Sequence, residues 1–193
     1  MPRARCLWTL AAVAACGRAD FTPRADDAPA PPADALICNP PAQLSYPSEG
    51  TAHSDGGVPP IWATNPPTSG LHFDRWARWN RAYAEVIPRG YWVHNLEHGG
   101  VVFGYRCPDG CAAEVARLTA MLATLPADAD CPALGHRAIV VPDPDLPANV
   151  RFAAAAWQNS WTANCVDEAS LVTFYKTKLS MAPEVNCQDG DYP

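Results

Sequence analysis

The stretch HNLEHGGVVFGY, at residues 94–105, decides how this chain is interpreted. Its first five residues contain three side chains that can bind a metal or transfer a proton, and the whole chain has only five histidines. Two glycines and an apolar run follow at once. A further histidine, His72, ends the turn-rich sequence NPPTSGLH just upstream. This clustering predicts a functional site rather than scattered surface imidazoles.

The backbone conformation of the motif decides which of its side chains can meet. In a regular strand His94 and His98 would share a face but lie about 13 Å apart, at a rise of roughly 3.3 Å per residue. In a helical turn, positions i, i+3 and i+4 converge, so these two histidines and Glu97 could face one centre. A chelating site therefore requires a turn or bend here. The glycine pair 99–100 permits one, because glycine adopts backbone angles that other residues avoid.

The predicted metal ligands are His72, His94 and His98, with Glu97 as a fourth ligand or as the carboxylate that orients an imidazole. Imidazole and carboxylate ligands suit zinc, copper or iron, and the first-row affinity order favours copper or zinc. We therefore predict the binding of one of these two metals.

Two other classes of function use the same residues. The first is an enzyme, metal-dependent or not, in which these groups act as acid and base and Glu97 is the candidate catalytic residue. The pattern also matches the H-x-x-E-H metalloprotease signature, but that signature needs a sustained helix, whereas a glycine pair and a valine-rich strand follow here. The second class is a structural or partner-binding protein whose histidines are hydrogen-bonded core residues.

The first 35 residues predict export and lipid anchoring. Arg3 and Arg5 precede a short apolar run, and VAAC at residues 13–16 reads as a lipobox with Cys16 as the lipidation site. The run is shorter than the ~20 residues of a membrane-spanning helix. We expect a lipoprotein signal peptide at 1–15, with an ordinary signal peptide as the alternative. A Pro/Ala/Asp-rich tether at 16–35 and a single globular domain at 36–193 follow.

These predictions describe an exported bacterial protein held on a membrane by its lipid and facing the periplasm or the exterior. The net charge is −6, and about −8 once the two signal-peptide arginines are removed. No block of Lys or Arg remains in the predicted domain, which argues against nucleic acid as a partner. No phosphate loop, dinucleotide fingerprint or Ser-His-Asp motif is present either.

The cysteine count indicates disulfides. Of eight cysteines, Cys6 falls in the predicted signal and Cys16 is the predicted lipid site. An even number in an exported chain favours disulfide bonds, but six cysteines permit 15 pairings and the sequence does not choose among them. The six are Cys38, Cys107, Cys111, Cys131, Cys165 and Cys187.

Local patterns predict an α+β fold with a single small sheet and about three packing helices, loop-rich and stapled by disulfides. Residues 36–70 carry many turn signals and predict loop with short extended pieces. Aromatic residues recur at helical spacing within 71–88, which is typical of core packing. Strands are predicted at 91–93, 101–105 and 138–141, and helices at 112–124, 146–157 and 167–179.

The sequences PPTSGLH at 66–72 and VHNLEHGGVV at 93–102 resemble the family known as domain of unknown function 3105. The resemblance covers roughly residues 58–180 and includes IVVP at 139–142. It implies an exported or membrane-tethered bacterial protein, and it implies no activity. The implied marker residues of the family are His72, His94, Glu97 and His98. The family pattern does not centre on cysteines, so the six here are expected to be a local addition for stability.

A second, narrower resemblance concerns FGYRCPDGC at residues 103–111, which precedes a predicted helix. It is similar to the copper site of Sco-type copper chaperones, which have a thioredoxin-like fold. The resemblance implies that Cys107 and Cys111 could hold copper or exchange disulfides. This chain departs from that pattern because its only histidine after Cys111 is His136, a short way downstream. The alternatives are a disulfide that closes a tight Pro-Asp-Gly turn, or two cysteines that are each bonded elsewhere.

Overall fold

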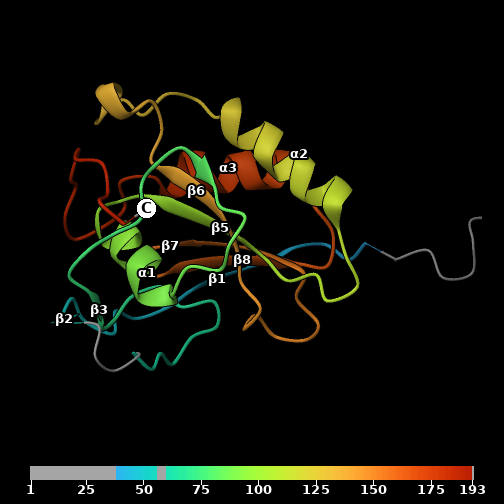
Figure 1. Ribbon diagram of the computed structural model, residues 1–193, viewed down its shortest axis with the longest axis horizontal. Coiled ribbons are helices and arrows are strands. Elements are labelled where there is room, and N and C mark those ends of the chain that lie inside the picture. Colours follow the sequence, from blue (N-terminus) through green and yellow to red (C-terminus); the bar gives the residue numbers. More distant parts are fainter. Residues whose placement is uncertain (1–37, 56–59, 193) are drawn as a thin grey trace, which may run out of the picture. The chain divides into compact units, whose positions relative to one another are not determined.

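The strand β5, Val101–Tyr105, follows the glycine pair and occupies the middle of a six-stranded sheet (Figure 1). The computed structural model describes residues 38–55 and 60–192. The strand order is β1-β8-β7-β5-β6-β4. The other strands are β1 (Ala42–Ser45), β4 (Arg81–Ala82), β6 (Ala138–Pro142), β7 (Phe152–Ala156) and β8 (Asn159–Ala163). A separate two-stranded sheet pairs β2 (His53–Ser54) with β3 (His72–Phe73).

The large sheet is mixed. β5 runs parallel to β6 and antiparallel to β7, so Phe103 lies between Val140 on one neighbour and Ala154 on the other. β4 is parallel to β6, whereas β7, β8 and β1 follow one another antiparallel. Together with three helices, this mixed sheet confirms the predicted α+β class. The small β2–β3 sheet is an addition that the sequence did not predict.

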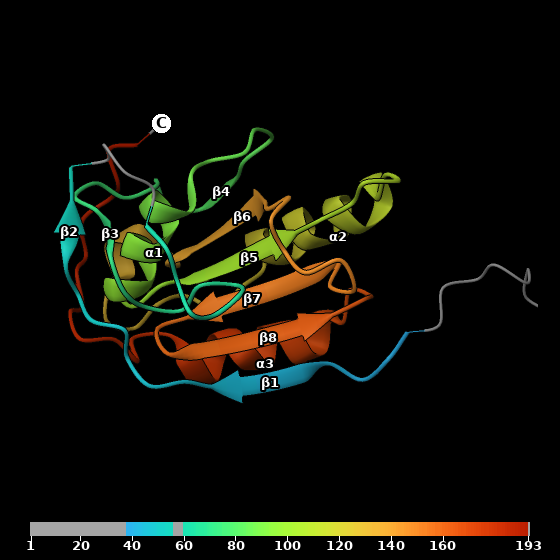
Figure 2. The same ribbon diagram turned by 90° about the horizontal axis from the view of Figure 1, so that it is seen from below.

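Helices cover both faces of the large sheet (Figures 1 and 2). α2 (Ala112–Ala123) and α3 (Glu168–Lys178) lie on one face, and α1 (Arg89–Glu97) lies on the other. Successive strand residues point to opposite faces. Val101 and Phe103 therefore pack in the core beneath α2 and α3, while Val102 packs in the core beneath α1.

Four predicted elements are confirmed with small shifts at their ends: β5, β6, α2 and α3. The α2 sequence buries Leu118 and Leu122 as its apolar spacing requires. The helix α3 begins after Asp167, whose carboxylate accepts a hydrogen bond from the Ser170 backbone N–H at 3.0 Å. This contact satisfies one of the unpaired N–H groups of the first turn.

Two local predictions were wrong. The predicted strand 91–93 lies inside α1. This helix was not recognised because the residues from Trp92 to Glu97 are all buried, so the sequence shows no helical periodicity. The predicted helix 146–157 contains β7, whose four alanines fit a strand held between β5 and β8 with every residue buried. The core packing expected for the aromatic residues within 71–88 is confirmed: Trp79 is buried, and Trp76 and Tyr83 pack against the same core, although the stretch contains only the short strands β3 and β4.

The six remaining cysteines form three disulfides: Cys38–Cys165, Cys107–Cys111 and Cys131–Cys187. They confirm the disulfide prediction and indicate an oxidising compartment. In the part of the chain that the structure describes, no helix has both the length and the apolar character needed to cross a membrane. The predicted signal peptide at 1–15, the lipidation site Cys16 and the tether at 16–35 lie outside the described residues.

Candidate metal centre

The helix α1 places two of the site side chains, His94 and Glu97, one turn apart on the same side. Close packing fixes this helix against the rest of the site. Gly90 lies against the ring of Phe73, where an added Cβ would come within 2.7 Å of the ring. Asn95 binds the loop between β3 and β4, since its side-chain amide donates to the Ala77 carbonyl and accepts from the Ala77 N–H. The helix ends at Glu97, and Gly99 follows the capping residue with a φ of 83°, in the left-handed region that glycine favours.

The small β2–β3 sheet supplies the other two side chains. Its parallel register sets His53 directly opposite His72, and their ring centroids lie 4.6 Å apart. The His53 ring also stacks on His94 at a centroid distance of 4.8 Å. A two-residue pairing therefore brings together histidines that are far apart in sequence.

The four side chains converge on one point. The carboxylate Oε2 of Glu97 lies 2.9 Å from Nε2 of His72, 3.2 Å from Nε2 of His53 and 3.9 Å from Nε2 of His94. One ligand atom from each of the four residues lies within 4.8 Å of all the others. Among residues 38–55 and 60–192, this is the one group of three or more His, Cys, Asp or Glu side chains with such geometry. It could hold a metal ion.

Backbone carbonyls fix the orientation of two imidazoles. Nδ1 of His72 lies 2.7 Å from the Gly70 carbonyl oxygen, and Nδ1 of His94 lies 2.6 Å from the Phe73 carbonyl oxygen. A carbonyl oxygen can only accept, so each Nδ1 carries the proton and donates it. The Nε2 atoms are then the ones that face Glu97. Metal-binding histidines are commonly oriented in this way, by a hydrogen bond from the ring nitrogen that does not bind the metal.

Three of the four side chains are buried, and the fourth is partly exposed to solvent. His72, His94 and Glu97 are almost fully enclosed, whereas 46% of the His53 side chain is exposed. Burial lowers the pKa of His94 to about 4, so its imidazole is neutral near pH 7. Burial alone would raise the pKa of Glu97, but the hydrogen bonds and positive charge of the neighbouring imidazoles outweigh it and hold that pKa below its usual range. Glu97 is therefore an anion surrounded by imidazole rings.

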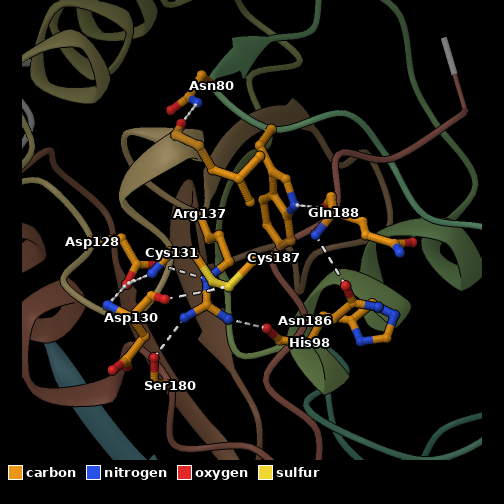
Figure 3. Close-up of polar contacts among 12 residues, drawn as sticks. Asn80, His98, Asp128, Asp130, Cys131, Arg137, Ser180, Asn186, Cys187 and Gln188 are labelled. Atoms are coloured by element: carbon orange, nitrogen blue, oxygen red, sulfur yellow. Dashed lines mark hydrogen bonds and ion pairs between the residues drawn. A yellow bond between two sulfur atoms is a disulfide. The ribbon is translucent and has the colours of Figure 1, made fainter.

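A buried ion pair supports the C-terminal end of α1 (Figure 3). The guanidinium of Arg137 contacts the Asp128 carboxylate at 2.5 Å and donates to the Ser180 hydroxyl at 2.6 Å. It also donates to the carbonyl oxygen of His98, the residue that caps α1. The nearby Cys131–Cys187 disulfide ties the C-terminal segment to the same region. The orientation of the motif helix thus depends on residues well outside the motif.

A family model described as "Protein of unknown function (DUF3105)" matches residues 61–189. This chain belongs to the DUF3105 family. No curated protein and no solved structure matches it. The DUF3105 match contains His72, His94 and Glu97, whereas His53 lies upstream of the matched residues. The resemblance inferred from the two motifs is therefore confirmed.

The structure places His98 differently from the other predicted ligands. Its ring packs against Trp76 and His94, with centroid distances of 4.5 Å to each, and it is not part of the four-residue group. Both ring nitrogens are buried without a hydrogen-bond partner, and the nearest carboxylate, that of Glu184, lies 3.8 Å from Nδ1. Burial lowers the pKa of His98. The His98 ring packs beside the site, and in the group that could hold a metal His53 takes the place that the sequence analysis gave to His98.

Sequence reasoning missed His53 because no local motif surrounds it. It lies in a segment with many turn signals, 41 residues before His94, and only the pairing of β2 with β3 brings it into place. The only signal for His53 was the histidine count. The chain has five histidines, three were already predicted as ligands, and His136 lies near the third predicted strand, so His53 was the one left over.

The two cysteines of the Sco-like sequence are joined to each other. Cys107 and Cys111 form a disulfide across the Pro-Asp-Gly turn, as one alternative interpretation of that stretch predicted. Within the described residues, no cluster with metal-binding geometry includes either cysteine or His136. A copper site of the Sco type is therefore not assembled in this structure.

Proposed function

We propose that this chain is an exported, lipid-anchored protein that binds a transition metal, copper or zinc. The ligands are Nε2 of His53, His72 and His94 and a carboxylate oxygen of Glu97. The observation that carries the proposal is the fixed orientation of His72 and His94. Both commit their Nδ1 protons to backbone carbonyls and turn Nε2 toward the same carboxylate.

Electrostatics favour a cation at this point. A neutral His94 presents a lone pair on Nε2, 3.9 Å from a negatively charged oxygen of Glu97. Two acceptors in a buried site repel each other unless a proton or a metal ion lies between them. Because the pKa of His94 is about 4, a proton is not available to it near neutral pH. A divalent cation satisfies this lone pair, the other imidazoles and the carboxylate together.

The spacing of the ligand atoms fits a first-row metal. Ligands at about 2.1 Å from a tetrahedral zinc ion lie about 3.4 Å from one another. The three nitrogen–oxygen distances to Glu97, 2.9, 3.2 and 3.9 Å, fall on both sides of that value. Three imidazoles and one carboxylate form a ligand set that suits zinc or copper rather than calcium or magnesium, which prefer oxygen.

The compartment follows from the disulfides together with the N-terminal sequence. Three disulfides are typical of a protein outside the cytoplasm. The basic residues, apolar run and cysteine of the first sixteen positions support a lipid anchor at Cys16. We place the metal site on the periplasmic or exterior side of a bacterial membrane.

One observation favours a second candidate, a metal-dependent hydrolase. The half-exposed His53 leaves the site accessible from one side, so water or a substrate could reach a bound ion there. A core of structural histidines is supported less well. Such residues would be separated and fully hydrogen-bonded, whereas these converge on one carboxylate and His98 has no partner.

The test is the metal content of the full chain, secreted to an oxidising compartment and purified without a metal column. Inductively coupled plasma mass spectrometry should find about one equivalent of copper or zinc per chain. His53→Ala, which alters the most exposed ligand, should lose it while keeping the wild-type circular dichroism spectrum. His136→Ala is the matched control and should keep it. A metal-free wild type that also binds neither ion on titration would refute the proposal.

A further inference from the structure

We propose that the Cys107–Cys111 disulfide is a thiol–disulfide exchange site that reacts with cysteine thiols of other exported proteins. It differs from the other two disulfides in the length of chain it closes. Those join cysteines 127 and 56 residues apart, whereas Cys107 and Cys111 are separated by four. A short loop loses little conformational freedom when it is closed, so opening this bond affects the stability of the fold least.

The two sulfur atoms are not equally accessible. Cys111 is 7% exposed and packs in the core beneath α2. Cys107 is partly exposed and lines a groove of about 280 Å³. The walls of the groove are mostly apolar: Val86, Tyr105, Pro108, Pro142 and Pro144, with Arg106 beside them. An extended apolar segment that carries a cysteine can therefore approach Cys107, whereas Cys111 is shielded.

The buried sulfur is in a position to leave as a thiolate. Cys111 is the N-cap of the twelve-residue helix α2, and its carbonyl accepts the first helical hydrogen bond from Val115 at 2.9 Å. The positive end of a helix stabilises a thiolate. The guanidinium of Arg151 lies at the same turn, where it donates to the Asp109 carboxylate at 3.3 Å and to the Gly110 carbonyl oxygen at 3.4 Å, and its buried Nε has no hydrogen-bond partner. The helix end favours negative charge on Cys111, and Arg151 offsets the charge of Asp109 beside it.

The reaction balances as an exchange between thiols. A partner thiolate attacks Sγ of Cys107 and forms a new S–S bond, while the Cys107–Cys111 bond breaks and its electron pair goes to Sγ of Cys111. A second thiol of the partner then attacks the mixed disulfide and releases Cys107. The partner dithiol is oxidised to a disulfide, this pair is reduced to two thiols, and the partner is the reductant. Metal at the histidine site plays no part.

The experiment uses the oxidised full chain with a chelator and a reduced peptide that carries one cysteine between apolar residues. After quenching with an alkylating agent, peptide mapping locates the products. We expect the peptide on Cys107 and the alkyl group on Cys111, at a rate about tenfold above that at either other disulfide. Arg151→Gln should slow the reaction severalfold by removing a positive charge, and Glu114→Gln, in the first turn of α2, should accelerate it. Arg117→Gln is the matched control and should change nothing.

Three results would overturn the proposal. One is equal labelling of the two cysteines, which would mean that the fold does not direct the attack. Another is a rate that does not respond to either charge change while circular dichroism shows intact folds. The third is reaction with reduced glutathione as fast as with the apolar peptide, which would exclude a groove that selects a polypeptide thiol. Any of these would leave the bond as a structural link.

Discussion

Arg137 and Asp128 form an ion pair at 2.5 Å in which neither side chain is exposed to solvent. The same guanidinium holds the carbonyl oxygen of His98 at the end of α1 and the hydroxyl of Ser180 at the start of the C-terminal segment. One buried cation therefore joins the loop before β6, the motif helix and the C-terminal segment. Its removal would leave a buried carboxylate without a counter-charge, as well as an unsupported helix end.

Arg137→Met should destabilise the protein by about 3–5 kcal/mol, because breaking a buried pair from one side leaves an uncompensated charge. Urea unfolding followed by circular dichroism measures the change. The exposed pair Arg117–Glu168 is the matched comparison, and Arg117→Met should change stability by less than about 1 kcal/mol. Adding Asp128→Asn to Arg137→Met should recover much of the loss, because it removes the charge and keeps an acceptor for the Asp130 and Cys131 N–H groups. A double variant no more stable than the single one would contradict this explanation.

Gly100→Ala should destabilise the fold by roughly 1–3 kcal/mol, because an added Cβ would overlap the ring of Trp79. The matched control lies four residues along the same segment. At Gly104 an added Cβ would meet its nearest atom at 3.6 Å, an ordinary contact, so Gly104→Ala should have little effect. Thermal unfolding of the two variants provides the comparison. Equal melting temperatures would show that Trp79 can move aside freely.

The three disulfides should contribute unequally to stability. In the chain-entropy model, Cys38–Cys165, which closes a loop of 127 residues, is worth about 5 kcal/mol, whereas Cys107–Cys111 is worth about 2 kcal/mol. Replacing the first pair by alanines should therefore lower the urea midpoint far more than replacing the second. An inverted order would mean that the short loop maintains native packing around α2 rather than only restricting the unfolded chain.

Much of this fold could be predicted from local sequence, and the predictions that were wrong share a physical cause. Amphipathic α2 and α3 and the apolar strands β5 and β6 were predicted because each has a distinct buried face or run. The helix α1 is buried almost all round, so no apolar stripe distinguishes it from a strand. β7 consists mostly of alanine, a good helix former, and its neighbours in the sheet override that preference.

The aromatic residues near Trp79 recur at helical spacing and pack in the core as predicted, but they do so without a helix. Backbone groups that a helix would use are bound elsewhere: the N–H of Trp79 donates to Asp189, and the carbonyl of Trp76 accepts from the Tyr192 N–H. The site shows the same limit of local reasoning. His94 and Glu97 share a turn and His72 has its own motif, so all three were predicted. His53 depends on a strand pairing across a gap in sequence, which periodicity cannot reveal.

Stability without metal should fall as the pH decreases below about 6.5, and His94 is the main cause. Its pKa is about 4 in the folded protein and 6.5 ordinarily, so between these values the unfolded chain takes up a proton that the folded chain does not. The contribution is on the order of 3 kcal/mol at most. Glu97 continues the trend at lower pH, since its lowered pKa contributes stability that is lost as the carboxylate is protonated. Urea unfolding in chelator should show a shallower slope between pH 6.5 and 4 for His94→Gln. An unchanged slope would place the effect elsewhere.

The ligand set predicted from the motif includes His98, whereas the group in the structure includes His53 in its place. Variants of these two residues therefore distinguish the two sets. If His53 is the ligand, His98→Gln should keep the bound metal and change mainly stability, because its ring packs against Trp76 and His94 without a hydrogen bond. His53→Ala should lose the metal at little cost to the fold, since its side chain is half exposed. Metal content and urea midpoints, measured on both variants, give opposite patterns for the two residues. Metal lost from His98→Gln and retained by His53→Ala would restore the motif-based set and require α1 to turn so that His98 faces the centre.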